Sequence, residues 1–226
     1  MKSLFFASLL LLIGSCAPSR FVEPLNKGTW AVGGNFGGPV IDFAGAPIPV
    51  PLTAVEVGYG LDSNLTVHGG LHTTSLLFGV GQIDFGATYK FLEQKKYFPN
   101  LSASLGGNVA YSPSEKAVEF WPTLDVNAYW NYGKRDSYFY VGVNNYFVLQ
   151  SRMAFDQPQN QRMIFNPQMG HVFKPKSGGY QFFTELKFIA PYLDSDKAFV
   201  PYKSIFGTNG ATGFYLGFRK LLGSKK

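Results

Sequence analysis

The stretch that decides the fold is residues 82–91, which read QIDFGATYKF. From Ile83 onward every second side chain is apolar or aromatic, and the positions between them are polar or glycine. This period of two predicts a β-strand with one apolar and one polar face. The same alternation recurs in residues 53–61 and 65–72, so the chain is predicted to consist of β-strands.

The rest of the chain extends this pattern to ten strands. They are expected at residues 29–38, 53–61, 65–72, 82–91, 100–112, 118–132, 137–150, 163–174, 179–191 and 211–221. Short connections at 62–64, 93–99, 133–136 and 175–178 alternate with longer ones at 39–51, 151–162 and 192–209. Short turns at one end, longer loops at the other and an even strand number are typical of transmembrane barrels. The fold prediction is an all-β, antiparallel up-and-down transmembrane barrel over residues 28–222, followed by a basic tail at 223–226.

The size of the side chains indicates which face points outward. Charged residues make up 15% of the chain, below the roughly 25% of soluble domains, and aromatic residues make up 17%. The apolar face carries rings that would overfill a small barrel, whereas the polar face is rich in small residues. These rings are Trp30, Phe36, Phe85, Phe91, Phe120, Trp130, Phe139, Phe147, Phe182, Phe214 and Phe218. We therefore expect the apolar face to contact lipid; the alternative is a soluble barrel with its apolar face inward.

Aromatic residues near the strand ends predict girdles at the two membrane interfaces. They are Tyr97, Phe98, Tyr132, Tyr138, Tyr180 and Tyr192. The basic residues of the short turns are expected to contact anionic lipid of the inner leaflet, although simple solubility of the turns is an equal alternative.

The N-terminus carries an export signal. Lys2 precedes an apolar run, LFFASLLLLIG at residues 4–14, which is far shorter than the ~20 residues of a membrane-spanning helix. The sequence from Leu12 to Cys16 resembles the bacterial lipobox, with an aliphatic residue, two small residues and then cysteine. The resemblance implies that residues 1–15 are removed as a signal peptide and that Cys16 is acylated, which palmitate labelling would detect. Residues 16–27 would be a lipidated linker, anchored at the periplasmic leaflet; a free thiol in an ordinary signal peptide is the alternative.

The last predicted strand contains GFYLGF at residues 213–218. Gly213, Leu216 and Phe218 resemble the spacing of the outer-membrane assembly signal, although eight residues follow Phe218 where that signal usually ends the chain. As a whole, residues 28–222 resemble the small outer-membrane β-barrel proteins of Gram-negative bacteria. The resemblance implies an outer-membrane location and the barrel-assembly machinery as a partner during biogenesis.

Strand parity assigns ten titratable side chains to the lumen. They are Glu56, His68, His72, Asp84, Lys90, Glu119, Asp125, Glu185, Lys187 and Arg219. Because isolated charges are costly in a narrow lumen, we expect the acids to pair with Lys187 and Arg219. Two interpretations remain open, a salt-bridged filling of the barrel and the selectivity region of a small pore.

Catalysis and metal binding are poorly supported by the sequence. His68 and His72 lie about 13 Å apart along one strand, which is too far to share a metal ion. An enzyme would need His72 beside Thr74, Ser75 or a carboxylate, as in outer-membrane lipid A deacylases and acyltransferases. The His-x-Ser spacing of those enzymes is absent, and parity puts Ser75 on the opposite face from His72. No cofactor and no metal are expected.

The functional prediction is a lipid-anchored outer-membrane barrel with a structural or interaction role and no enzymatic activity. Its expected partners are outer-membrane lipid and a protein bound through the loops 39–51 and 192–209, although these loops could equally pack over the barrel mouth. The net charge of +6 lacks the concentrated basic and aromatic stripe of a nucleic-acid binder. The alternatives are a passive or ligand-selective pore and a membrane-embedded lipid hydrolase or acyltransferase.

Overall fold

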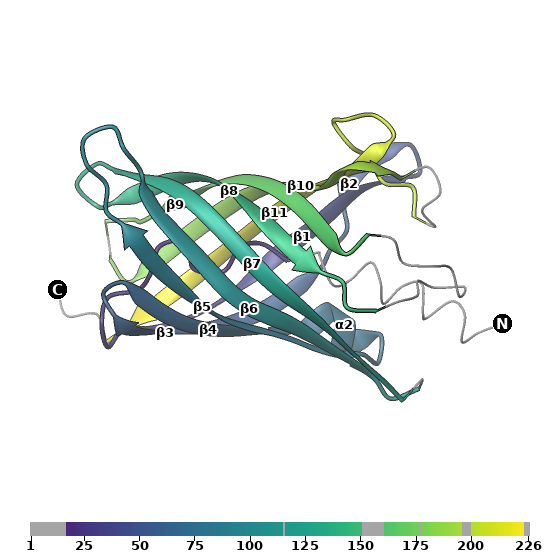
Figure 1. Ribbon diagram of the computed structural model, residues 1–226, viewed down its shortest axis with the longest axis horizontal. Coiled ribbons are helices and arrows are strands. Elements are labelled where there is room, and N and C mark those ends of the chain that lie inside the picture. Colours follow the sequence, from purple (N-terminus) through teal and green to yellow (C-terminus); the bar gives the residue numbers. More distant parts are fainter. Residues whose placement is uncertain (1–16, 115, 151–160, 177, 196–199, 224–226) are drawn as a thin grey trace.

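The computed structural model describes residues 17–114, 116–150, 161–176, 178–195 and 200–223. Ten antiparallel strands close into a barrel (Figure 1). They are β1 (Trp30–Phe43), β3 (Thr53–Asp62), β4 (Leu65–His72), β5 (Gly81–Leu92), β6 (Asn100–Ser112), β7 (Ala117–Tyr132), β8 (Ser137–Phe147), β9 (Met163–Phe173), β10 (Tyr180–Asp194) and β11 (Asn209–Leu222). The predicted ten-stranded transmembrane barrel is confirmed.

Closure joins the two ends of the chain. β11 pairs with β1 from the Trp30–Leu222 pair to the Pro39–Gly213 pair. Without free edges, every strand finds backbone partners on both sides, which a membrane requires because hydrocarbon offers no replacement. On β11, Leu216 and Phe218 face outward, whereas a Cβ added at Gly213 would lie 2.8 Å from the Tyr215 ring. The role of this strand as an assembly signal stays a prediction.

The expected loop at residues 39–51 is largely a hairpin. β1 continues to Phe43 and pairs with the short strand β2 (Ala46–Pro49) through four residues. Ala44 and Gly45 form the two-residue turn, and both have positive φ, as a tight hairpin with the natural strand twist requires. The prediction of a loop beginning at residue 39 was therefore wrong, since Val40 to Phe43 continue the strand.

The two long connections of the same end contact each other. The backbone N–H of Lys203 donates to the carbonyl of Val40 at 2.8 Å, and its Nζ lies 2.8 Å from Asp42 Oδ2. The hairpin of β1 and β2 therefore packs against residues 200–203. A helical turn, α2 (Thr73–Leu77), joins β4 to β5 at this end. No helix among the described residues is long and apolar enough to cross a membrane.

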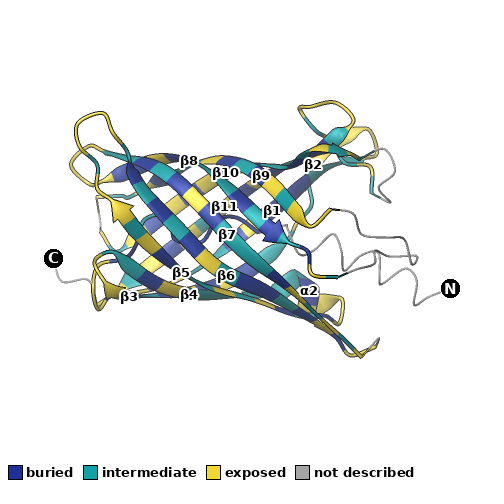
Figure 2. Cartoon of the chain, viewed as in Figure 1, coloured by how far each residue is buried: buried dark blue, intermediate teal, exposed yellow. Residues whose placement is uncertain are grey.

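The apolar face points outward, as predicted. Figure 2 shows exposed and buried residues alternating along the strands. Phe85 on β5 is 48% exposed and Phe139 on β8 is 56% exposed, whereas Arg219 on β11 is 2% exposed. A soluble barrel would show the reverse, so the large rings form the lipid-facing surface.

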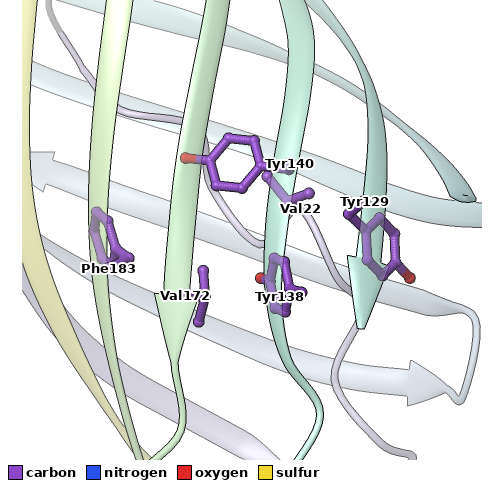
Figure 3. Packing of buried hydrophobic residues seen from close by; sticks show 6 residues of the cluster. All are labelled: Val22, Tyr129, Tyr138, Tyr140, Val172 and Phe183. Carbon is purple, nitrogen blue, oxygen red and sulfur yellow. The ribbon is translucent and has the colours of Figure 1, made fainter. Parts of the chain in front are cut away.

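The lumen also contains large rings, which the sequence analysis missed. Tyr138 was expected in a girdle, but it is 1% exposed and lies inside the barrel with Tyr129, Tyr140 and Phe183 (Figure 3). Its neighbour Phe139 faces lipid, so strand parity turns Tyr138 inward. The prediction for Tyr138 was wrong because it was based on the position of this residue near a strand end and not on its strand parity.

Candidate functional site

The lumen holds a segment of the chain itself. Residues 17–28, which we call the plug segment, lead into β1; residues 17–25 lie inside the barrel, and residues 26–28 are exposed at its rim. At the rim with the short turns, the N–H of Gly28 donates to the carbonyl of Gly60 at 2.8 Å. At the other end of the segment, Ala17 contacts Lys187 in the middle of β10. Of the described part of the expected linker, the structure therefore places residues 17–25 within the lumen and residues 26 and 27 at its rim.

The first residues of the plug segment bind to β10. Lys187 Nζ donates to the carbonyl of Ala17 at 2.6 Å, and the N–H of Ser19 donates to Glu185 Oε2 at 3.0 Å. The same Glu185 oxygen accepts from the hydroxyl of Tyr140 at 2.6 Å. Because Glu185 and Lys187 are each 1% exposed, these contacts replace the water that the charges would otherwise require.

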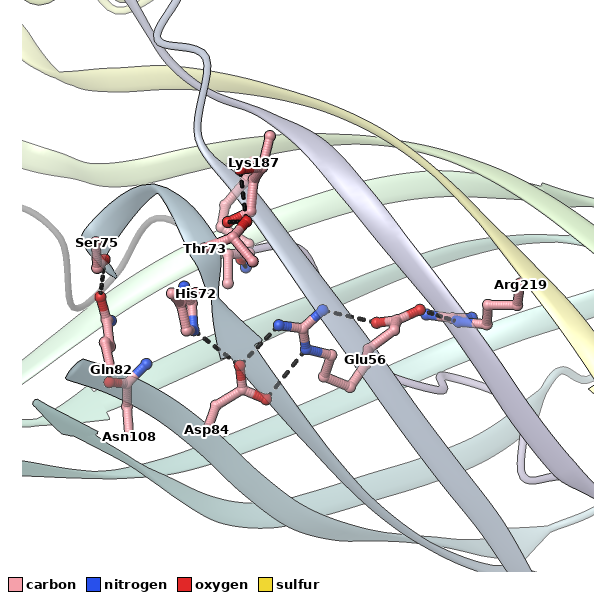
Figure 4. Close-up of polar contacts among 12 residues, drawn as sticks. Glu56, His72, Thr73, Ser75, Gln82, Asp84, Asn108, Lys187 and Arg219 are labelled. Atoms are coloured by element: carbon pink, nitrogen blue, oxygen red, sulfur yellow. Dashed lines mark hydrogen bonds and ion pairs between the residues drawn. The ribbon is translucent and has the colours of Figure 1, made fainter. Parts of the chain in front are cut away.

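Arg20 is the centre of the site. Its Nε and Nη2 donate to the two oxygens of Asp84 at 3.1 and 2.7 Å, and its Nη1 donates to Glu56 Oε2 at 2.6 Å. This guanidinium therefore forms a bidentate pair with one carboxylate and a third bond to another, the geometry that makes arginine pairs strong. The row of charges across the lumen can be followed in Figure 4 through Asp84 and Glu56.

The two carboxylates also bind side chains of the wall. Arg219 Nε donates to Glu56 Oε1 at 2.5 Å, and His72 Nε2 lies 2.8 Å from Asp84 Oδ2. The guanidinium of Arg219 in turn stacks on Phe183 and on Phe21 of the plug segment, with its carbon 4.6 and 4.3 Å from the ring centroids. Arg20, Arg219 and His72 thus form one network with these two carboxylates.

The second half of the plug segment is bound near the short-turn rim. Ser102 Oγ donates to the carbonyl of Val22 at 2.7 Å, and the N–H of Leu25 donates to Thr66 Oγ1 at 2.7 Å. The carboxylate of Glu23 accepts from Asn131 Nδ2 at 3.0 Å and from Lys174 Nζ at 2.5 Å. Hydrogen bonds therefore hold the segment along its whole described length.

Glycines in the wall make room for the segment. An added Cβ would lie 2.4 Å from the Phe21 ring at Gly58, 2.2 Å from the Asn26 carbonyl oxygen at Gly60 and 2.6 Å from Arg20 Nη2 at Gly70. These three positions face inward on β3 and β4. The wall is shaped to the plug segment, because a side chain at any of these positions would displace it.

The structure divides the ten predicted lumen side chains into separate groups. Glu56, His72, Asp84 and Arg219 meet around Arg20, and Glu185 and Lys187 meet around the start of the plug segment. His68 contacts Ser104 and Thr88, and Asp125 accepts from Asn144. Lys90 lies 3.5 Å from Glu93, and Glu119 lies on β7 two residues from the start of that strand. Their functional role stays a prediction.

The sequence did not reveal Arg20 as a lumen residue, although Arg20 joins the two carboxylates. The only local signal is an arginine between the export signal and the first strand, in a stretch that also carries Glu23 and Lys27. It lies outside any alternating pattern, so parity could not assign it to the lumen.

His72 and Ser75 do not form a pair. Both are buried, but Ser75 Oγ donates to Gln82 Oε1 at 2.7 Å, and Thr74 Oγ1 accepts from the N–H of Thr53 at 2.8 Å. Parity had placed Ser75 opposite His72, and this was wrong because α2 interrupts the strand alternation. The partner of His72 is Asp84, which also binds Arg20.

The space left beside the plug segment is small. A cavity of about 40 Å³ is lined by Ala17, Arg20, Asp84, Asp125 and Lys187, among others. Since one water needs roughly 10–15 Å³ by this measure, the cavity holds a few water molecules. With the plug segment in place, it is too small for a solute the size of an amino acid.

Comparison with solved structures supports the fold. The chain is similar to an outer-membrane channel from Pseudomonas putida F1, with a TM-score of 0.50, 10% identity and coverage of 91% of this chain and 100% of the channel. The translocator domain of the autotransporter NalP from Neisseria meningitidis gives a TM-score of 0.48 and 7% identity, covering 97% of this chain and 93% of that domain. No protein-family model and no curated protein matches the chain. At 10% identity the likeness to the Pseudomonas putida channel shows the fold of outer-membrane β-barrels alone.

Proposed function

We propose that the protein is an outer-membrane channel for small polar solutes and that its own plug segment closes the lumen. The observation that supports this proposal is that the plug segment lies in a polar lumen and packs against glycines of the barrel wall. A purely structural barrel can fill its interior with side chains of the wall. Here the wall leaves a chain-sized space, with Gly58, Gly60 and Gly70 lying against Phe21, Asn26 and Arg20.

The size of the plug segment sets the size of the open pore. An extended chain occupies about 5 Å in one direction and about 10 Å in the other, the spacings between strands and between sheets. Its departure would leave a passage of that order, lined by Glu56, Asp84, Ser102, Glu185 and other polar side chains. The likeness to a channel of Pseudomonas putida F1 is consistent with this function.

The contacts of the plug segment favour the closed state. Each hydrogen bond between segment and wall contributes about 0.5–1.5 kcal/mol net, because water replaces it when the segment leaves. Bonds to Arg20 involve two charged groups and belong at the upper end of this range or above it. The unacylated channel is therefore expected to open rarely without a factor that binds the open state.

Gly60→Ala tests the plug directly. The new methyl group would collide with the backbone of residues 25 and 26, so the segment must shift and the conductance in planar bilayers should rise several-fold. Gly81→Ala is the matched control, because a Cβ at Gly81 meets nothing within 4 Å and the current should stay at the level of the parent. Equal currents in both variants would contradict closure by the plug segment.

Lipid anchoring and closure are proposed as alternative positions of one segment. Cys16 of the lipobox lies outside the described residues, but Ala17 follows it and is buried in the lumen. One residue spans at most about 3.6 Å, so an acyl chain on Cys16 reaches the periplasmic leaflet only if the plug segment leaves the barrel. The acylated form is therefore expected to be the open form.

Cys16→Ala should abolish palmitate labelling and lower solute permeation. The variant is expressed behind a signal peptide cleaved before residue 16, so that it differs from the acylated protein in the lipid and one side chain. Permeation of a small cationic solute into cells or vesicles is then compared between the two. Label retained on the alanine variant would refute the anchor, and equal permeation would refute its coupling to opening.

A further inference from the structure

The guanidinium of Arg20 occupies a site that the barrel wall builds by itself. Glu56 Oε1 is held by Arg219 and Asp84 Oδ2 is held by His72, and neither of these partners belongs to the plug segment. Within the part of the chain that the structure describes, the other two oxygens, Glu56 Oε2 and Asp84 Oδ1, are bonded by Arg20. When the segment leaves, these two oxygens face the pore with their carboxylates still oriented.

The shape of the barrel wall matches the planar guanidinium group of Arg20. Gly70 lies against Arg20 Nη2, where a Cβ would come within 2.6 Å of the nitrogen. The cavity of about 40 Å³ borders both Arg20 and Asp84, so the site has open space beside it even in the closed barrel. In the closed barrel the side chain of Glu56 is fully buried and that of Asp84 is 15% exposed, which strengthens their charge-assisted bonds to Arg20 relative to water.

We propose that the open lumen carries a binding site for small guanidinium compounds, formed by Glu56 and Asp84, and that Arg20 is its internal occupant. The proposal rests on the channel function and names the class of solute that the channel takes. A planar guanidinium presents a fork of donors that can reach Asp84 and Glu56 together. An ammonium ion is a compact point charge, so it satisfies the two carboxylates less well.

Such a site links the solute to opening. A guanidinium compound and Arg20 compete for the same oxygens, so binding of the compound is possible only when Arg20 has withdrawn. A ligand that binds one of two states shifts the population toward that state. The solute therefore favours its own passage by stabilising the barrel with the plug segment displaced.

The test is chemical rescue of the full chain carrying Arg20→Gly, with methylguanidinium as the probe. The measured quantity is the temperature at which the folded barrel loses its heat-modifiable migration on a gel. At ten times its dissociation constant, methylguanidinium should raise this temperature by about 3–6 °C in a saturable way. Lys27→Gly is the matched control, because Lys27 is an exposed cation of the same segment and should show no saturable rise.

The outcomes separate the site from simple charge effects. A rise with methylguanidinium, little rise with methylammonium, and loss of the rise in Arg20→Gly with Asp84→Asn would support the site. An equal rise with methylammonium, an equal rise in the Lys27→Gly control, or no rise at all would overturn it.

A second measurement keeps this inference distinct from the channel function. In the chain lacking residues 17–28, millimolar methylguanidinium added on one side should reduce the sodium current at least about twofold more than methylammonium does. A sodium current without this selective block would overturn the site and leave the channel standing. Rescue of Arg20→Gly without any current from the deletion variant would support the site and overturn the channel.

Discussion

Deletion of residues 17–28 is expected to raise the conductance of the refolded barrel by more than about tenfold, since a chain about 5 Å by 10 Å in section leaves the lumen. The barrel itself should persist, because β1 begins at Trp30 and its pairing with β11 does not involve the deleted residues. Planar bilayer recordings compare the variant with the chain that retains the segment, refolded in the same way.

The open variant should prefer cations. Among the ten titratable side chains assigned to the lumen, five carboxylates face three basic groups. Deletion also removes Arg20, the cation bound to Asp84 and Glu56. A reversal potential in a salt gradient measures the preference. A folded deletion variant with the same small current as the parent would disprove closure by the plug segment.

Phe85→Arg is expected to lower the free energy of unfolding by about 2–4 kcal/mol, the cost of a basic side chain at the bilayer midplane of a barrel. Phe85 faces outward on β5 and is 48% exposed, with Phe120 of β7 at a ring-centroid distance of 6.4 Å. The change places a charge in hydrocarbon without altering the lumen. Urea titrations in lipid vesicles measure the difference.

Phe98→Arg is the matched control for this substitution. Phe98 is 72% exposed and lies in the short connection between β5 and β6, where the aromatic girdle is predicted. An arginine near the interface should cost only about 0–1 kcal/mol. Equal losses for both variants, or no loss for Phe85→Arg, would contradict the lipid-facing orientation of β5.

Strand alternation predicted the barrel because it is a local property. A strand with one face in lipid and one in a polar lumen must repeat every two residues, so the pattern is visible in short windows such as residues 82–91. All ten strands were located in this way. The error at residues 39–51 arose where β1 continues beyond the barrel into a hairpin, because there no lipid face enforces the alternation.

The lumen was predicted less completely than the outer surface. Strand parity assigned Glu56, Asp84 and Arg219 to the lumen. Parity does not show how deep in the lumen a side chain lies or which other side chain it contacts. Parity gave the wrong face for Ser75, because α2 replaces the strand there. Tyr138 was assigned to the aromatic girdle although its strand parity points it into the lumen, where the structure places it.

The sequence by itself determined the strands and which face of each strand points outward, because both depend on neighbours within a few residues. Only the tertiary structure decided that residues 17–25 enter the lumen and that Arg20 joins Asp84 to Glu56. Arg20 and Asp84 are 64 positions apart, and Ser19 and Glu185 are 166 apart. The plug segment has no repeating pattern, since its conformation follows the surrounding wall, and that wall exists only after β1 has closed on β11.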